Sequence, residues 1–412
     1  MDQQANKAAR PLPGLTGLAV ILSLGGNAAL AGDAITEGLK GAMAGATAKL
    51  DLRYRYEYVD QDGIADEAGA STLLTRLNVK TGMVGGFHGL VEVDNVSYLG
   101  GDTFNNTENG VITRPVVADP DYTEINQAYI AYAFNDNNSA TVGRQRINHA
   151  GQRFLGGVGW RQNEQTFDAA SLRLQPLDGL TLDYSYIWEV NRIFGPEGAD
   201  AEFEGDTHAF LASYQLAAGH TLSAYAYLLD FNQAPALSSE TYGIDYMGSF
   251  VVSEDLKLGV NLAFAEQSDY EDNPADFDAG YYFGEFSAMF KPVTFAIGHE
   301  VLESDNGVSF KTPLATLHKF QGFADIFLVT PANGIEDTYL KVATTIGPVN
   351  LVAFYHDFEA ETGGMDYGDE IDFIATYKIN DTYSLMFKYA AYDADQWATD
   401  TDKAWLMVSA SF

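Results

Sequence analysis

The sequence predicts an all-β protein, a transmembrane antiparallel β-barrel of 18 strands, with 16 strands as the second choice. Three observations support this fold class. Charged and apolar residues alternate along many segments, which is typical of strands with one wet face and one apolar face. No segment after residue 31 has the roughly 18 consecutive apolar residues of a membrane-spanning helix. Short and long connections alternate along the chain, as in bacterial outer-membrane barrels.

Composition narrows the possible functions. The 412 residues include 57 Asp and Glu against 23 Lys and Arg, a formal net charge of −34, and no cysteine. Nucleic-acid binding requires a concentrated basic face, so this charge argues against such a partner. The absence of cysteine removes disulfides, thiolate catalysis and Cys-ligated metal centres. We expect no metal site and no cofactor.

The N-terminus has the features of a secretory signal peptide. Lys7 and Arg10 precede a modest apolar stretch at 15–24, and the small residues Ala29 and Ala31 stand before Gly32. This stretch is much shorter than the ~20 residues that span a bilayer as a helix. We therefore expect residues 1–31 to be a signal peptide, 32–45 a periplasmic segment, either a helix or part of the rim, and 46–412 the barrel.

The first strand shows the alternation most clearly. From Lys49 to Tyr58 every odd position is charged and every even position is Leu or Tyr. Similar alternation occurs at 180–186, 370–378 and 404–412. Half-buried strands of a soluble sandwich also alternate, so this pattern alone does not identify a membrane barrel.

The connections identify the class of barrel. The predicted strands are 46–59, 71–84, 87–98, 123–134, 138–147, 166–176, 179–192, 206–217, 220–231, 240–252, 256–268, 277–291, 293–303, 336–347, 349–359, 368–379, 382–393 and 403–412. Tight turns alternate with longer loops, which predicts short periplasmic turns on one rim and long extracellular loops on the other. This places the chain in the outer membrane of a Gram-negative cell, in contact with lipid and lipopolysaccharide. By resemblance to other outer-membrane barrels, the terminal Phe412 would be read by the barrel-assembly machinery.

The charged residues indicate where solute would pass. Every Arg after residue 31 lies at or before residue 192. Because an Arg on the lipid face costs about 2–4 kcal/mol at mid-depth, these side chains should face an aqueous lumen. The predicted pore-lining residues are Arg53, Arg55, Arg76, Arg144, Arg146, Arg153, Arg161, Arg173, Glu189, Glu300 and Asp372. Glu92, Asp94, Glu285 and Glu370 would join these acids opposite the arginines and create a transverse field. Two interpretations stay open: the arginines pair with acids to make a polar lumen foldable, or they act in the passage of anions.

The connection 304–335 is unusually long, and such loops are usually functional. Its residues Leu314, Leu317, Phe320, Phe323 and Phe327 are too apolar for a freely solvated loop. One hypothesis is that it folds into the barrel mouth as a constriction, and the alternative is an external lid packed on other loops. The residues predicted to form the constriction are Leu317, His318, Lys319 and Phe320.

Four segments resemble the alginate-export family of outer-membrane barrels. They are Leu50–Glu57 (LDLRYRYE), Val142–Ile147 (VGRQRI), Arg153–Ala169 (RFLGGVGWRQNEQTFDA) and Thr312–Asp325 (TPLATLHKFQGFAD). The resemblance implies an 18-stranded barrel whose arginine-lined lumen is selective for an anionic polysaccharide such as alginate. By matched position it implies that Arg53, Arg55, Arg144, Arg146, Arg153 and Arg161 face the lumen.

Other classes fit the sequence less well. The seven His are scattered, and the chain has neither a G-x-S-x-G nor an H-E-x-x-H motif, so a hydrolase is not indicated. A gated receptor would need a plug domain before the first strand, where only residues 32–45 are available. The Asp-rich segment 270–276 lacks EF-hand spacing and is best interpreted as a solvated loop. We therefore expect a non-enzymatic outer-membrane channel that passes an anionic saccharide by diffusion. The alternative is a non-conducting structural or adhesive barrel.

Overall fold

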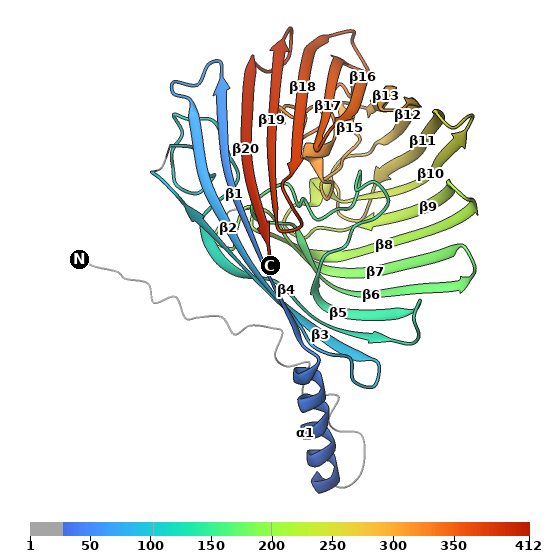
Figure 1. The fold of residues 1–412 in the computed structure, drawn as a ribbon. Helices are drawn as coiled ribbons and strands as arrows, with labels where there is room; N and C mark the ends of the chain where they lie inside the picture. The colour runs from blue at the N-terminus through green and yellow to red at the C-terminus, as the bar shows by residue number, and fades with distance from the viewer. Residues whose placement is uncertain (1–27, 102, 199) are drawn as a thin grey trace.

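A computed structural model of the protein describes residues 28–101, 103–198 and 200–412. Eighteen antiparallel strands form one closed sheet (Figure 1). They are β1 (Thr47–Gln61), β2 (Ala68–Lys80), β3 (Phe87–Tyr98), β4 (Tyr122–Ala133), β5 (Ser139–Gln145), β6 (Thr166–Leu177), β7 (Leu180–Asn191), β8 (Glu202–Ala217), β9 (His220–Leu229), β10 (Ser239–Val251), β11 (Leu256–Asp269), β12 (Asp278–Phe290), β13 (Val293–Leu302), β16 (Ile335–Ile346), β17 (Val349–Glu359), β18 (Asp366–Lys378), β19 (Tyr383–Ala394) and β20 (Thr401–Ser411). The predicted fold and strand number are confirmed, and the 16-strand alternative is wrong.

The barrel closes between its first and last strands. β1 pairs with β20 from Asp51 opposite Ser411 to Gln61 opposite Thr401. Beyond this ladder, Leu50 and Phe412 exchange two backbone hydrogen bonds of 3.1 and 2.9 Å. A closed sheet leaves no strand edge unpaired, which is the condition for spanning a hydrocarbon layer with strands.

The two rims differ as the sequence predicts. The short connections are 81–86, 134–138, 178–179, 218–219, 252–255, 291–292, 347–348 and 379–382. The connections on the opposite rim are 62–67, 99–121, 146–165, 192–201, 230–238, 270–277, 303–334, 360–365 and 395–400. Small elements within them were not predicted: the hairpin β14 (Ser304–Asp305) and β15 (Val308–Ser309), and the 3-10 turns η4 (Pro235–Leu237) and η5 (Leu317–Lys319).

Helix α1 (Ala28–Ala44) precedes β1 and extends beyond the rim of short turns (Figure 1). Its end packs against the turn after β2, where the Gly82 amide donates to the Ala42 carbonyl oxygen at 2.8 Å. Among the described residues, no helix is both long enough and apolar enough to cross a membrane. Most of the predicted signal peptide, residues 1–27, lies outside the described residues, and cleavage after Ala31 remains a prediction.

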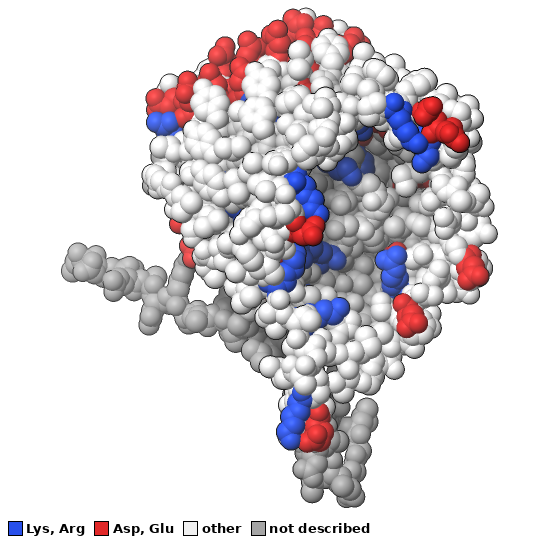
Figure 2. All heavy atoms as spheres, viewed as in Figure 1, with Lys and Arg blue, Asp and Glu red and all other residues white. Residues whose placement is uncertain are grey.

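The wall is apolar outside and charged inside. Large apolar side chains such as Val91, Ile130 and Phe295 are exposed on the outer face, while Arg55 and Asp372 are fully buried. In Figure 2, Asp and Glu gather along the edge farthest from α1, and Lys and Arg lie inside the hollow that faces the viewer. Apolar side chains facing lipid and charged ones facing the interior are what a membrane barrel requires.

Candidate functional site: the lumen

Two long connections fold into the barrel and pack against each other (Figure 1). An isolated β-bridge joins Leu155 of loop 146–165 to Leu314 of loop 303–334, and both residues are almost fully buried. The Thr316 amide also donates to the Gln152 carbonyl oxygen at 3.0 Å. Loop 303–334 also contacts Glu370 and Lys403 of the wall. These contacts fit the constriction hypothesis, which stays a prediction.

One group of predicted pore-lining arginines is neutralised by acids on adjacent strands. Arg76 contacts Asp94 at 2.6 Å and Glu164 at 2.6 Å. Arg146 pairs with Glu92 and with the same Glu164. Although burial alone would raise the pKa of Glu164, Arg76 and Arg146 lower it below its usual range. Glu164 of the inserted loop is therefore held as an anion between two arginines.

Strand register explains these pairs and corrects one prediction. Arg76 on β2 lies directly opposite Asp94 on β3. Arg144 on β5 lies opposite Asp168 on β6, which lies opposite Glu189 on β7. Arg144 contacts these two acids at 2.8 and 3.4 Å. The prediction that Glu92, Asp94 and Glu189 face the arginines across the pore is therefore wrong, because neighbouring strands bring them onto the same wall.

Two arginines of loop 146–165 reach different parts of the wall. Arg153 contacts Glu300 of β13 at 2.7 Å and lies 4.8 Å from the centre of the Phe320 ring. Arg161 contacts Glu57 of β1 at 3.2 Å. These buried pairs seat the loop, because a buried charge is tolerated only when it is paired.

The remaining predicted residues differ in exposure. Arg55 is fully buried, contacts Asp119 at 3.3 Å and lies 4.3 Å from the Trp160 ring. Arg173 is largely exposed and lies 3.5 Å from Asp183. Asp372 is fully buried, and within the described part of the chain neither of its carboxylate oxygens has a hydrogen-bond partner; Oδ2 lies 3.7 Å from His356 Nε2.

Arg53 differs from these arginines because, among the described residues, it contacts no carboxylate. Its guanidinium donates to Gln162 Oε1 at 2.8 Å, to the Gly159 carbonyl oxygen at 2.8 Å and to the Arg161 carbonyl oxygen. All three acceptors are neutral and belong to loop 146–165. The charge of Arg53 is therefore not cancelled by direct pairing.

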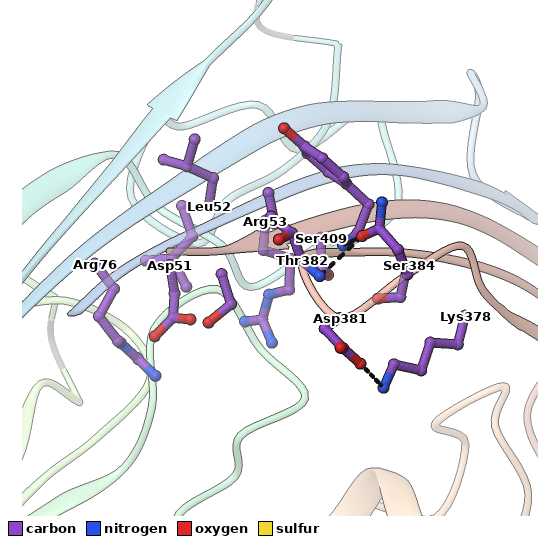
Figure 3. A pocket seen from close by; sticks show the side chains of 14 residues that line it. Asp51, Leu52, Arg53, Arg76, Lys378, Asp381, Thr382, Ser384 and Ser409 are labelled. Carbon is purple, nitrogen blue, oxygen red and sulfur yellow. Dashed lines mark hydrogen bonds and ion pairs between the residues drawn. The ribbon is translucent and has the colours of Figure 1, made fainter.

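Arg53 lines a hollow of about 470 Å³ near the rim of short turns (Figure 3). Across β1, β20, β19 and β18, the register places Arg53 opposite Ser409, Ser409 opposite Ser384, and Ser384 opposite Lys378. Asp51, Arg76, Thr382 and Ser411 also line this hollow. It therefore combines hydroxyls with cations and with the acids Asp51 and Asp381, of which Asp381 pairs with Lys378 at 2.7 Å.

The predicted constriction residues lie around the contact between His318 and Trp160. The His318 ring stacks on Trp160 with centroids 4.2 Å apart and an angle of 9°. Lys319 is exposed and donates to the Gly151 carbonyl oxygen at 2.8 Å, Leu317 is half-buried, and Phe320 packs near Arg153. His318 lies at the junction of the two inserted loops.

The sequence interpretation missed three residues of this contact, namely Asp325, Lys388 and Lys403. Asp325 lies 2.7 Å from His318 and 3.1 Å from both Arg161 and Lys403. Lys388 and Lys403 occupy alternating positions of β19 and β20, so period-2 patterning could have assigned them to the lumen. Their partners could not be found in this way, because they come from a loop.

Comparisons with known proteins agree with this fold. The family model described as alginate export matches residues 46–248. A comparison with the curated proteins gave no match. Among solved structures, Pseudomonas aeruginosa OccK1 (OpdK) is similar with a TM-score of 0.73 and 15% identity, covering 90% of this chain and 100% of that one.

Two further structures have the same fold. Pseudomonas aeruginosa OccK9 (OpdG) gives a TM-score of 0.72 and 18% identity over 90% of this chain and 99% of that one. Acinetobacter baumannii OccAB2 gives a TM-score of 0.71 and 15% identity over 90% of this chain and 99% of that one. At these identities the structural likeness establishes the fold, and the family match adds the sequence relationship. The chain belongs to the alginate-export family of outer-membrane β-barrel channels.

Proposed function

We propose that this protein is a non-enzymatic channel through which an anionic saccharide, or a similar anionic solute, diffuses across the outer membrane. The observation that carries the proposal is Arg53, a guanidinium that contacts no carboxylate of the described residues and lines a hollow with several hydroxyls. A guanidinium has five N–H donors, and its three contacts leave some of them free. Guanidinium matches the geometry of a carboxylate, and hydroxyl side chains suit a sugar.

The other arginines have a different role in this proposal. Arg76, Arg144 and Arg146 form ion-pair networks with acids of the same wall and of loop 146–165. They make the lumen polar and hold the loop in place, whereas Arg53 supplies a positive charge whose described contacts are all neutral. This combines the two interpretations that the sequence left open.

The proposed partners follow from the same arrangement. Lipid and lipopolysaccharide would surround the apolar outer face. Phe412, whose ring lies 6.1 Å from that of Tyr383, is exposed at the end of the closing strand and would be the residue that the assembly machinery reads.

Planar-bilayer recordings test the proposal. Wild-type protein should conduct, prefer anions and be blocked by oligouronates. Arg53→Glu should move the reversal potential toward cations, whereas Lys40→Glu, the same charge change on exposed helix α1, should leave it unchanged. Equal effects of the two variants would remove the role of Arg53, and a complete absence of conductance would favour a structural or adhesive barrel.

A further inference from the structure

The carboxylate of Asp325 is bound as a ligand would be. One oxygen, Oδ1, accepts from His318 Nδ1 at 2.7 Å. The other, Oδ2, accepts from Arg161 Nη2 at 3.1 Å and from Lys403 Nζ at 3.1 Å. Both carboxylate oxygens are thus bound by donors from three separate residues, which is how a protein recognises a carboxylate.

The donor role of His318 is fixed by its other ring nitrogen. Lys388 Nζ lies 2.7 Å from His318 Nε2. An ammonium group can only donate, so Nε2 accepts and Nδ1 carries the proton that is donated to Asp325. Trp160 on one ring face and Phe323 at 5.4 Å keep the imidazole in this orientation.

Two of the donors do not depend on the segment that carries Asp325. Lys403 belongs to β20 of the wall. Arg161 belongs to loop 146–165 and is held separately by Glu57 of β1 at 3.2 Å. If Asp325 withdrew, these cations would remain in place without their shared anion.

The backbone that delivers Asp325 is held in an unfavourable conformation. Gln321 and Asp325 have φ angles of 56° and 60°, in the left-handed region that residues with a Cβ adopt only at a cost. Between them, Gly322 has a φ of 79°. The contacts of the Asp325 carboxylate contribute to offsetting this cost.

A reciprocal contact holds the same segment. The Ala324 amide donates to Glu370 Oε1 of β18 at 2.7 Å, and the Phe323 amide donates to the same oxygen. Consecutive amides that converge on one anion form an anion-binding nest. The amides of segment 321–325 thus bind the Glu370 carboxylate of the wall, and its Asp325 carboxylate binds Lys403 of the wall.

From this geometry we infer that Arg161, Lys403 and His318 form a carboxylate-binding site, that Asp325 fills it in this structure, and that a carboxylate of the solute competes with Asp325 for it. The inference rests on the proposed function, in which the solute is an acidic saccharide. An arriving carboxylate would replace the internal one contact for contact and release segment 321–325 from the lumen. The position of segment 321–325 would then depend on whether an acidic solute is bound.

Calorimetry with D-glucuronate tests the site, using full-length protein in detergent and D-glucose as the uncharged control. Asp325→Asn removes the internal anion and keeps the side-chain shape. It should bind glucuronate about ten-fold more tightly than wild type, and adding Lys403→Met should abolish the gain. Asp276→Asn, which changes an exposed acid on the same rim, should behave as wild type.

A folded Asp325→Asn that binds glucuronate no more tightly than wild type would overturn the inference. Folding is checked by strand circular dichroism, and Asp325→Ala serves as the second variant if Asp325→Asn does not fold. The two proposals fail separately. Anion-selective conductance without a gain in Asp325→Asn rejects only the internal site, whereas a gain in a channel without anion preference rejects only the transport proposal.

Discussion

The ammonium of Lys388 and the Nε2 atom of His318 lie 2.7 Å apart inside the barrel. Lys388 also lies 3.2 Å from the centre of the Phe323 ring and 4.2 Å from that of Trp160. A wall lysine thus contacts residues from both inserted loops at once. Such an arrangement requires a neutral His318, and burial does lower the pKa of His318 well below its usual value.

Replacing His318 by Phe should destabilise the protein. The variant keeps an aromatic ring against Trp160 but removes the hydrogen bonds to Asp325 and Lys388. Buried groups that lose a partner cost about 1–3 kcal/mol each. Urea titration should show a lower free energy of unfolding, whereas His299→Phe at an exposed position should change it little. Equal stability of both variants would contradict this account.

Acid should weaken the folded state through His149. Burial, followed by the charge of Arg173, lowers its pKa to about 4. The unfolded chain takes up this proton near the ordinary value of about 6.5, so it binds more protons than the folded state between these values. The free energy of unfolding should therefore fall as the pH drops from 6.5 to 4. In His149→Phe, which keeps a ring near Tyr227, the fall should be smaller; an unchanged pH profile would exclude His149 as its source.

The pair of Arg153 and Glu300 gives a test of how loop 146–165 is seated. Arg153→Met should cost about 3–5 kcal/mol, because it leaves the buried Glu300 carboxylate without its cation. Arg153→Met combined with Glu300→Gln should recover part of that loss, since no uncompensated charge remains. Unfolding by guanidinium measures both. Additive losses in the double variant would show that the two residues are not coupled.

Gly322 should be intolerant of a side chain. A Cβ there would lie 2.4 Å from a carboxylate oxygen of Glu370, at a φ of 79°. Gly322→Ala should therefore displace segment 321–325, which we expect to raise single-channel conductance and the rate of tryptic cleavage after Lys319. Gly307→Ala is a matched control, because Gly307 has a φ of 77° but no atom within 4 Å of the added Cβ. If Gly307→Ala had the same effect, backbone strain alone would explain the result.

Charge reversal at Arg144 or Arg146 should also move the reversal potential toward cations. Arg144→Glu would add an acid beside Asp168 and Glu189, and Arg146→Glu would add one beside Glu92 and Glu164. Bilayer recordings in a salt gradient measure the shift. If neither variant changed selectivity, the ion pairs of this wall would have only a structural role.

The barrel itself could be predicted because the patterns that specify it are found within single strands and the connections between them. Alternation along Lys49–Tyr58 assigns one face to lipid and the other to water, and the alternating connections set the strand number. The same local reasoning placed Arg53 and Arg55 in the lumen. Both inferences need only the two-residue period of a strand and the cost of a charge in hydrocarbon.

The partners of these residues could not be predicted. Asp119 meets Arg55, and Asp325 meets Lys403, because irregular loops carry them into the barrel. Loop paths depend on tertiary contacts such as the Leu155–Leu314 bridge, for which the sequence has no periodic signal. The acids of β3 and β7 were assigned to the wrong side because the order of strands around the lumen was not used to pair them.

The pairing of β1 with β20 has a consequence for biogenesis. The first strand, β1, can pair early with β2, but its second neighbour, β20, becomes available only after all the other strands have been translated and exported. Until then the sheet has two unpaired strand edges, which can pair with strands of other proteins in the periplasm. A premature stop codon that removes only residues 401–412 would therefore leave the whole polypeptide unsealed and exposed to periplasmic proteases.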